Sequence, residues 1–173
     1  MRKYIFVLFL LISTLNIYSQ ANVNISTNVG ITLSNGIALN KIKGDLDFGN
    51  VLYTGESLNL SKTANLGIEY EITGFRNRNV NISYSSSVNL TNAGWVNLYG
   101  GTIGILRFTP KVTHTGGNIN YVGAVNLSNN SRVKLTNTKP LGKLYIWIGG
   151  NIIGSANRPY GDYSGTFTLT VAY

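Results

Sequence analysis

Residues 22–36 read NVNISTNVGITLSNG, and this stretch decides the fold. Every odd position from Val23 to Leu33 carries valine, isoleucine, threonine or leucine, with asparagine, serine, threonine or glycine between them. A period of two is typical of a β-strand that buries one face. Asn35 and Gly36 tolerate positive φ, and the alternation resumes at Ile37, so the pattern predicts a β-hairpin here.

The same short period recurs along the rest of the chain, and glycine and asparagine separate the segments. Strands are predicted at residues 46–52, 57–61, 66–72, 80–84, 87–90, 95–99, 105–109, 119–127, 132–136, 144–148 and 165–173. No window carries a 3.6-residue apolar stripe long enough to predict a helix. Many short strands with glycine turns indicate an all-β antiparallel sandwich or barrel. We expect one domain, over residues 21–173.

The first 20 residues have the form of a secretory signal peptide. Arg2 and Lys3 precede an uncharged apolar run, residues 4–15, which is too short for a membrane span of about 20 residues. Ser19-Gln20-Ala21 offers small residues at alternate positions, so cleavage is expected on one side or the other of Ala21. The alternative is a retained anchor. The pattern favours an exported chain with no membrane span after cleavage.

The composition argues against several kinds of active site. The chain has no cysteine, which excludes disulfides, thiolate nucleophiles and cysteine metal sites. His114 is its single histidine, which argues against a histidine metal centre or a Ser/His triad. Fourteen Lys and Arg exceed six Asp and Glu, but the basic residues are scattered. We expect a structural or binding protein with no catalytic residues, cofactor, metal or nucleic-acid partner.

Two acidic pairs are candidates for catalysis or metal binding. Asp45 and Asp47 lie two residues apart, as do Glu69 and Glu71, so each pair would share one face of a strand. Paired carboxylates can serve as general acid and base or bind calcium. The simpler interpretation places Asp47 in a turn and the two glutamates on the solvent face of their strand. His114 is expected in a polar turn.

Four stretches, taken in their order, carry a resemblance to a known family. They are Leu46-Asp47-Phe48-Gly49, Ile72-Thr73-Gly74, residues 144–150 and the ending GDYSGTFTLTVAY at residues 161–173. Together they resemble the secreted bacterial family described as domain of unknown function 4402, over essentially the whole mature chain. The closing strand is also similar to those of spore coat protein U and chaperone–usher pilin subunits. The resemblance implies an exported, immunoglobulin-like or pilin-like β-sandwich of a Gram-negative envelope, in the periplasm, at the cell surface or outside the cell. It also implies a possible role as a fibre subunit, and no catalytic residues.

Two segments are candidate subunit interfaces, because a pilin-like subunit completes its sandwich with an extended segment of a neighbour. The candidate donor strand presents Val23, Ile25, Thr27, Val29, Ile31 and Leu33 on one face. The simpler interpretation is that it forms the first strand of the domain's own sheet. The last strand alternates Phe167, Leu169, Val171 and Tyr173 with mostly hydroxyl residues. We expect it in the core as a central strand; the alternative is an edge strand that templates a partner.

Aromatic residues give a further candidate contact. Tyr145 and Trp147 share one face of the predicted strand 144–148, and Leu144, Ile146 and Ile148 share the other. Either a loop covers the pair or it faces outward, where it would contact a glycan or a protein. Trp95 and Tyr99 are expected in or near the core. The overall expectation is a structural or adhesive envelope protein with protein partners, through self-assembly or other envelope subunits. The alternatives are a monomeric glycan-binding sandwich and a small outer-membrane β-barrel of eight strands.

Overall fold

The structure is a computed structural model that describes residues 36–173. The predicted signal peptide (residues 1–20), the candidate donor strand (residues 23–33) and Asn35 lie outside the described residues, and those interpretations stay predictions. The elements in chain order are β1 (Ile37–Lys43), β2 (Leu58–Lys62), η1 (Ala64–Leu66), β3 (Ile68–Gly74), β4 (Asn79–Tyr84), β5 (Val88–Thr91), α2 (Ala93–Tyr99), β6 (Ile105–His114), β7 (Val125–Asn126), β8 (Ser131–Lys134), β9 (Gly142–Gly154) and β10 (Leu169–Ala172).

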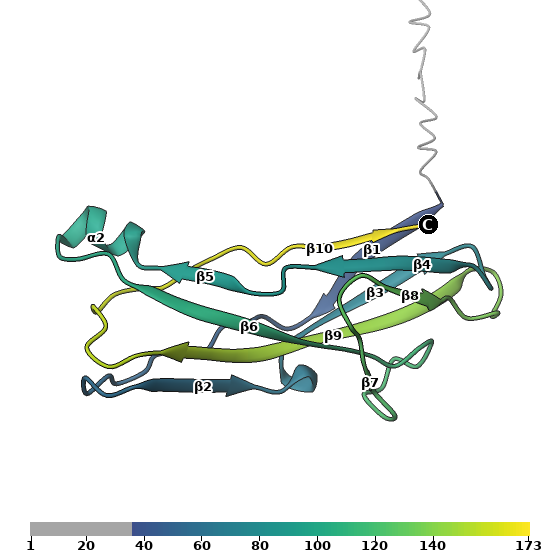
Figure 1. The fold of residues 1–173 in the computed structure, drawn as a ribbon. Helices are drawn as coiled ribbons and strands as arrows, with labels where there is room; N and C mark the ends of the chain where they lie inside the picture. The colour runs from purple at the N-terminus through teal and green to yellow at the C-terminus, as the bar shows by residue number, and fades with distance from the viewer. Residues whose placement is uncertain (1–35) are drawn as a thin grey trace, which may run out of the picture. The chain divides into compact units, whose positions relative to one another are not determined.

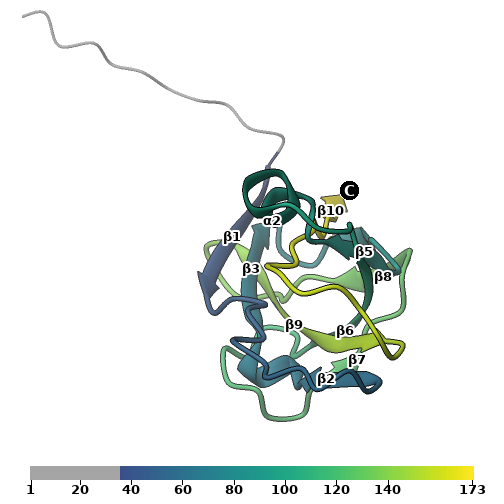
Figure 2. The same ribbon diagram turned by 90° about the vertical axis from the view of Figure 1, so that its left-hand side faces the viewer.

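The strands form two open sheets, and all pairings between the described strands are antiparallel. The larger sheet has the order β1-β3-β9-β6-β5, with β2 also beside β9 and β7 beside β6. The smaller sheet has the order β10-β4-β8 (Figure 1). Figure 2 shows the strands nearly end-on, arranged around a shared interior. The predicted all-β antiparallel sandwich is therefore confirmed.

The hydrophobic core lies between the two sheets. Val80 and Ile82 of β4 pack with Ile72 of β3 and with Ile146 of β9, and all four are fully buried. A second cluster, around Phe108, lies further along the larger sheet. Burying a side chain of this size stabilises the fold by about 1.5–3 kcal/mol relative to leaving it in water. The core therefore holds the two sheets together without a disulfide.

The longest strand, β9, organises the larger sheet. Its first half pairs with β3, its second half pairs with β2, and β6 lines its other side. β2 and β3 pair with successive parts of the same side of β9, and η1 connects them next to Gly149. A Cβ at Gly149 would collide with the Lys62 and Thr63 backbone, so only glycine allows the chains to approach this closely here.

Several predicted strands differ from the structure. Residues 46–52 form a loop without strand pairing, and residues 119–124 form turns that leave only β7 as a strand. The loop still sends Leu46 and Phe48 into the core, and the Phe48 ring meets that of Phe108 at 6.0 Å between centroids. Burial therefore alternates as predicted at residues 46–48, where tertiary packing replaces the ladder of hydrogen bonds, whereas Val51 and Leu52 are exposed.

The segment predicted as a strand at residues 95–99 is a short helix, α2. Its apolar run is too short for periodicity to separate a strand from a helix. Gly100 ends the helix at φ 76°, and its N–H donates to the Val96 carbonyl, as at a glycine C-cap. Tyr99 is 70% exposed and Trp95 only partly buried, so the predicted core position is wrong for Tyr99.

The basic turn at residues 75–78 joins the two sheets. It follows β3 of the larger sheet and precedes β4 of the smaller one, with Asn77 at φ 63°. Because β3 and β4 do not pair with each other, this turn crosses between layers and does not close a hairpin. Within residues 36–173, no helix has the length and apolarity that a membrane crossing requires.

Candidate functional site

The C-terminal strand β10 is an edge strand. Among the described residues it pairs with β4 alone, and β4 takes the middle of the smaller sheet. Within residues 36–173, β10 has a neighbour on one side only, whereas the prediction placed it centrally. The predicted alternation is confirmed, because Phe167, Leu169 and Val171 are partly buried against the core whereas Thr168 and its even-numbered neighbours are exposed.

The segment before β10 connects the two sheets. Ser164 and Thr91 of β5 exchange two backbone hydrogen bonds, of 2.9 and 3.0 Å. Four residues further on, Thr168 accepts from the Ser85 N–H at 3.0 Å and its own N–H donates to Ser85 Oγ at 3.2 Å. The C-terminal segment thus leaves the larger sheet and joins the smaller one, which fixes β10 in place at its start.

Within residues 36–173, the backbone groups on the outer side of β10 have no strand partner. Alternate residues of an antiparallel strand direct their N–H and C=O groups to opposite sides. Since Thr168 bonds to the β4 side, Thr170 does so too, and Leu169 and Val171 direct their backbone groups to the free side. None of the strands in the described part of the chain occupies that side.

Tyr173 links this edge to the first described residue. Its hydroxyl donates to the Gly36 carbonyl and accepts from the Phe75 N–H, both at 2.7 Å. Its ring stacks on Phe75 with centroids 5.7 Å apart, and the guanidinium carbon of Arg78 lies 5.8 Å from the ring centroid. Gly36 therefore lies close to the C-terminus. Figure 1 shows the C-terminal end of β10 near β1.

Tyr145 and Trp147 are buried on the opposite face of β9 from the core. They are 5% and 3% exposed, so the alternative in which a loop covers the pair is the one that the structure shows. Tyr121, from the loop after β6, meets Trp147 edge to face at 5.2 Å, and the indole N–H donates to Thr115 Oγ1 at 3.2 Å. Neither ring is presented to a glycan or a partner in this structure.

The two glutamates share this covered face with the aromatic pair. Glu69 lies opposite Trp147 and Glu71 lies opposite Tyr145 in the register of β3 and β9. Glu69 is 1% exposed and pairs with Lys43 at 3.2 Å, and the Lys43 ammonium also lies 4.9 Å from the Trp147 ring centroid. The predicted solvent-facing position is therefore wrong for Glu69, because Lys43 and the loop cover the face.

Glu71 is the acceptor of a small polar network. Lys143 Nζ and the Tyr145 hydroxyl both donate to Glu71 Oε1, the latter at 2.8 Å. The hydrogen bond from Lys143, followed by that from Tyr145, holds the pKa of Glu71 below its ordinary value. Burial, followed by the bond to Glu71, raises the pKa of Tyr145. These shifts favour the charged carboxylate and the neutral phenol, as in a structural ion pair.

The remaining sequence candidates lie in separate places. Asp47 accepts from the Gly49 N–H at 2.7 Å, which confirms its predicted turn role, and Asp45 pairs with Lys41 on the surface. His114 is the last residue of β6, and its Nδ1 accepts from the Gly116 N–H at 3.3 Å. Among residues 36–173, no three His, Asp or Glu side chains are placed to hold a metal ion.

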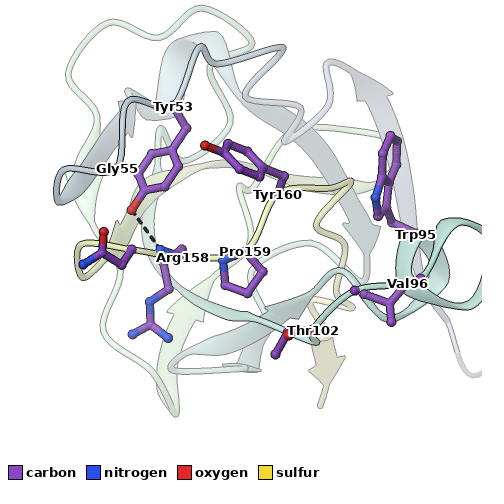
Figure 3. Close-up of a pocket in the computed structure, with 11 residues that line it drawn as sticks. Tyr53, Gly55, Trp95, Val96, Thr102, Arg158, Pro159 and Tyr160 are labelled. Atoms are coloured by element: carbon purple, nitrogen blue, oxygen red, sulfur yellow. Dashed lines mark hydrogen bonds between the residues drawn. The ribbon is translucent and has the colours of Figure 1, made fainter.

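A pocket that the sequence did not predict lies at the end of the sandwich where α2 is found. Figure 3 shows Tyr53, Tyr160 and Trp95 along its wall, with Arg158 and Pro159 between them. The pocket has a volume of about 500 Å³ and is open to solvent. Its walls come from the loop before β2, from α2 and the loop that follows it, and from the loop after β9. No single stretch of sequence therefore predicts the pocket.

A comparison with protein families finds a match. The model of the family described as domain of unknown function (DUF4402) matches residues 48–173. The chain belongs to this family. A search of curated proteins finds no match.

The match to DUF4402 begins at Phe48, in the middle of the Leu46-Asp47-Phe48-Gly49 stretch. The free edge of β10 and all walls of the α2-end pocket lie within the matched region. Strand β1 and the residues before it lie outside the match, which is narrower than the whole mature chain that the resemblance suggested.

Proposed function

We propose that this member of DUF4402 is an exported structural or adhesive protein of a Gram-negative cell envelope, and that its copies assemble by strand addition in the manner of pilin subunits. The free edge of β10 carries the proposal. Unpaired N–H and C=O groups in a row are a template for another extended chain. The sequence of residues 1–20, which has the form of a signal peptide, supports export.

Residues 23–33 of a second copy are the proposed donor. Their six odd-numbered side chains suit a strand that places alternate residues over a core, and 11 extended residues reach about 35 Å. Neither residues 21–40 nor residues 163–173 contain a charged side chain. Charges on edge strands are a common means of preventing unwanted pairing, so their absence from both segments favours pairing between copies.

The position of Gly36 adds to this argument. Gly36 lies beside the C-terminal end of β10, tied there by Tyr173, so the donor segment of the same chain is attached next to the edge it would complete. The same segment can therefore close its own subunit or extend to a neighbour. This choice is the one that distinguishes a monomeric sandwich from a fibre subunit.

Size measurement of two chains tests the proposal. Residues 21–173 should form oligomers whose size grows with concentration, whereas residues 34–173 should remain monomeric and folded. Adding a synthetic peptide of residues 21–33 to the shorter chain should give a one-to-one complex and raise its unfolding temperature. A monomeric long chain together with an unfolded short chain would show that residues 23–33 are an internal strand and would refute assembly by strand addition.

A further inference from the structure

We propose that the pocket at the α2 end of the sandwich binds a carbohydrate. The sequence candidates for glycan contact, Tyr145 and Trp147, are buried on another face, so this site is a different one. The inference stands independently of the assembly proposed for β10, because no wall of the pocket comes from β10 or from the residues before β1.

The pocket joins aromatic faces with hydrogen-bonding groups. Tyr160 is 72% exposed, and its ring meets Tyr53 at 6.2 Å between centroids in an edge-to-face arrangement. Trp95 lies along the same wall (Figure 3). Aromatic rings of this kind stack on the apolar C–H face of a sugar, and tyrosine and tryptophan also offer a polar edge.

Residues with polar side chains also line the pocket. They are Thr102, Asn157 and Arg158. Among the described residues, no carboxylate lies within ion-pair distance of Arg158, so its terminal nitrogens are available to hydroxyl or carboxylate oxygens of a sugar. Apolar walls with a few polar groups that fix orientation are typical of small-molecule sites.

Hydrogen bonds between the loops hold the pocket open before any ligand binds. The Arg158 N–H donates to the Tyr53 hydroxyl at 2.9 Å, and the Asn157 N–H donates to the Gly55 carbonyl at 3.0 Å. These bonds join the loop before β2 to the loop after β9. A site formed in advance loses less entropy when its ligand binds.

The fully buried Asn92 joins the remaining walls. Its amide N–H groups donate to the Tyr160 carbonyl at 2.7 Å and, more weakly, to the Thr102 carbonyl at 3.4 Å. Its side-chain oxygen accepts from the Gly104 N–H at 2.7 Å. Trp95 packs directly against Gly161, where a Cβ would lie 2.7 Å from the indole ring. Asn92 and Gly161 are therefore positioning residues, which set Tyr160 and Trp95 at their places in the wall.

The size of the pocket favours a sugar over a protein partner. A volume of about 500 Å³ is in the range of small-ligand sites, about 300–1,000 Å³. Protein interfaces use flatter and larger surfaces, of about 800 Å² on each partner.

The location suits adhesion. In Figure 1 the α2 end of the sandwich lies opposite the end at which Tyr173 meets Gly36. A subunit held by other copies at β10 would therefore keep this pocket free. A ligand on another surface could reach it without displacing a neighbouring subunit.

Tryptophan fluorescence and a biosensor test the proposal. The chain contains two tryptophans, Trp95 in the pocket and the buried Trp147, so a Trp147→Phe background isolates the signal of Trp95. The probes are soluble hexamers of β-linked glucose, xylose and N-acetylglucosamine, together with oligogalacturonate. At least one probe should bind residues 21–173 and shift the emission of Trp95.

Two exposed positions give the matched pair of variants. Tyr160→Ala should weaken binding of that probe about tenfold, because it removes a stacking face. Leu98→Ala, on α2 but outside the pocket, should leave the affinity unchanged. Both side chains are more than 70% exposed, so thermal unfolding of both variants should match that of the parent chain. Equal affinities of the two variants, or no binding of any probe up to about 1 mM, would overturn the proposal.

Discussion

The Tyr173 hydroxyl forms two hydrogen bonds: it donates to the Gly36 carbonyl and accepts from the Phe75 N–H. We expect Tyr173→Phe to lower the free energy of unfolding by about 1 kcal/mol, because the stacking on Phe75 stays and two partly exposed hydrogen bonds are lost. Urea unfolding followed by circular dichroism measures the change. Tyr160→Phe is the control, since its hydroxyl lies on a side chain 72% exposed and its loss should cost little. Equal effects of the two changes would contradict the linking role of Tyr173.

His114 makes the stability depend on pH. Burial lowers the pKa of His114, and its Nδ1 accepts a hydrogen bond that protonation would break. In the window between the lowered folded pKa and the ordinary value of about 6.5, the unfolded chain binds more protons, so stability rises with pH. The contribution of His114 is therefore present above about pH 6.5 and is lost as the pH falls through the folded pKa.

We expect His114→Gln to flatten the stability curve just below about pH 6.5. Unfolding temperatures measured from neutral to mildly acidic pH give the slope for both chains. Glu71, whose pKa is also lowered, should act only at more acidic pH and therefore serves as an internal reference. An unchanged slope in the His114→Gln chain would assign the pH dependence to another group.

Individual residues show where sequence reasoning reached its limit. Side chains two residues apart on a strand lie on the same face. Glu69, Glu71, Tyr145 and Trp147 do share one face of the sheet. This spacing does not fix what covers that face. Tyr121 and Thr115, from a loop over 20 residues earlier in the chain than Trp147, cover it here, and neither is visible in the local pattern.

The free edge of β10 gives a prediction at the scale of one element. Thr168 bonds to Ser85 on the β4 side, and alternate residues direct their backbone groups to the same side. The Thr170 N–H therefore points toward β4, and the Val171 N–H points to the open side. We expect Val171→Pro to prevent assembly while keeping most of the stability, because proline is tolerated where an edge N–H faces solvent. Thr170→Pro should instead lower the free energy of unfolding by about 1–3 kcal/mol through a lost bond to β4.

Light scattering and urea unfolding measure assembly and stability of the two variants side by side. If Thr170→Pro is the milder of the two, the backbone register assigned to β10 is wrong. If Val171→Pro folds and still assembles like the parent chain, the free edge of β10 is not the interface.

Local alternation predicted several strands correctly and one element wrongly. The patterns of residues 80–84, 105–109 and 144–148 predicted β4, β6 and β9, although β9 extends to 13 residues. At residues 95–99 the same reasoning predicted a strand where a helix formed, because a run of five residues is too short for periodicity to separate the two. The α2-end pocket depends on that helix, which explains why sequence reasoning missed the site.

At the scale of the whole molecule, the two proposed activities use different ends of the described body. Assembly uses β10 and the residues before Gly36, whereas the pocket is built from the loops around α2. Shared contacts between the two regions are few: Tyr163, just before the bridge to β5, donates to the Pro159 carbonyl at 2.8 Å. Effects of distant changes with no shared partner usually add.

We therefore expect the two activities to separate completely. A chain of residues 34–173 should lose assembly and keep the affinity of the parent for the saccharide that binds, because the walls of the pocket stay held by Asn92 and Tyr53. Tyr160→Ala in the long chain should show the reverse, with assembly unchanged and saccharide affinity lowered about tenfold. Sizing chromatography and biosensor titration measure assembly and affinity for these two chains and for one that carries both changes. A loss of sugar binding in the folded short chain would show that the pocket needs the assembled state, and the two ends would then have to be coupled through the sheet.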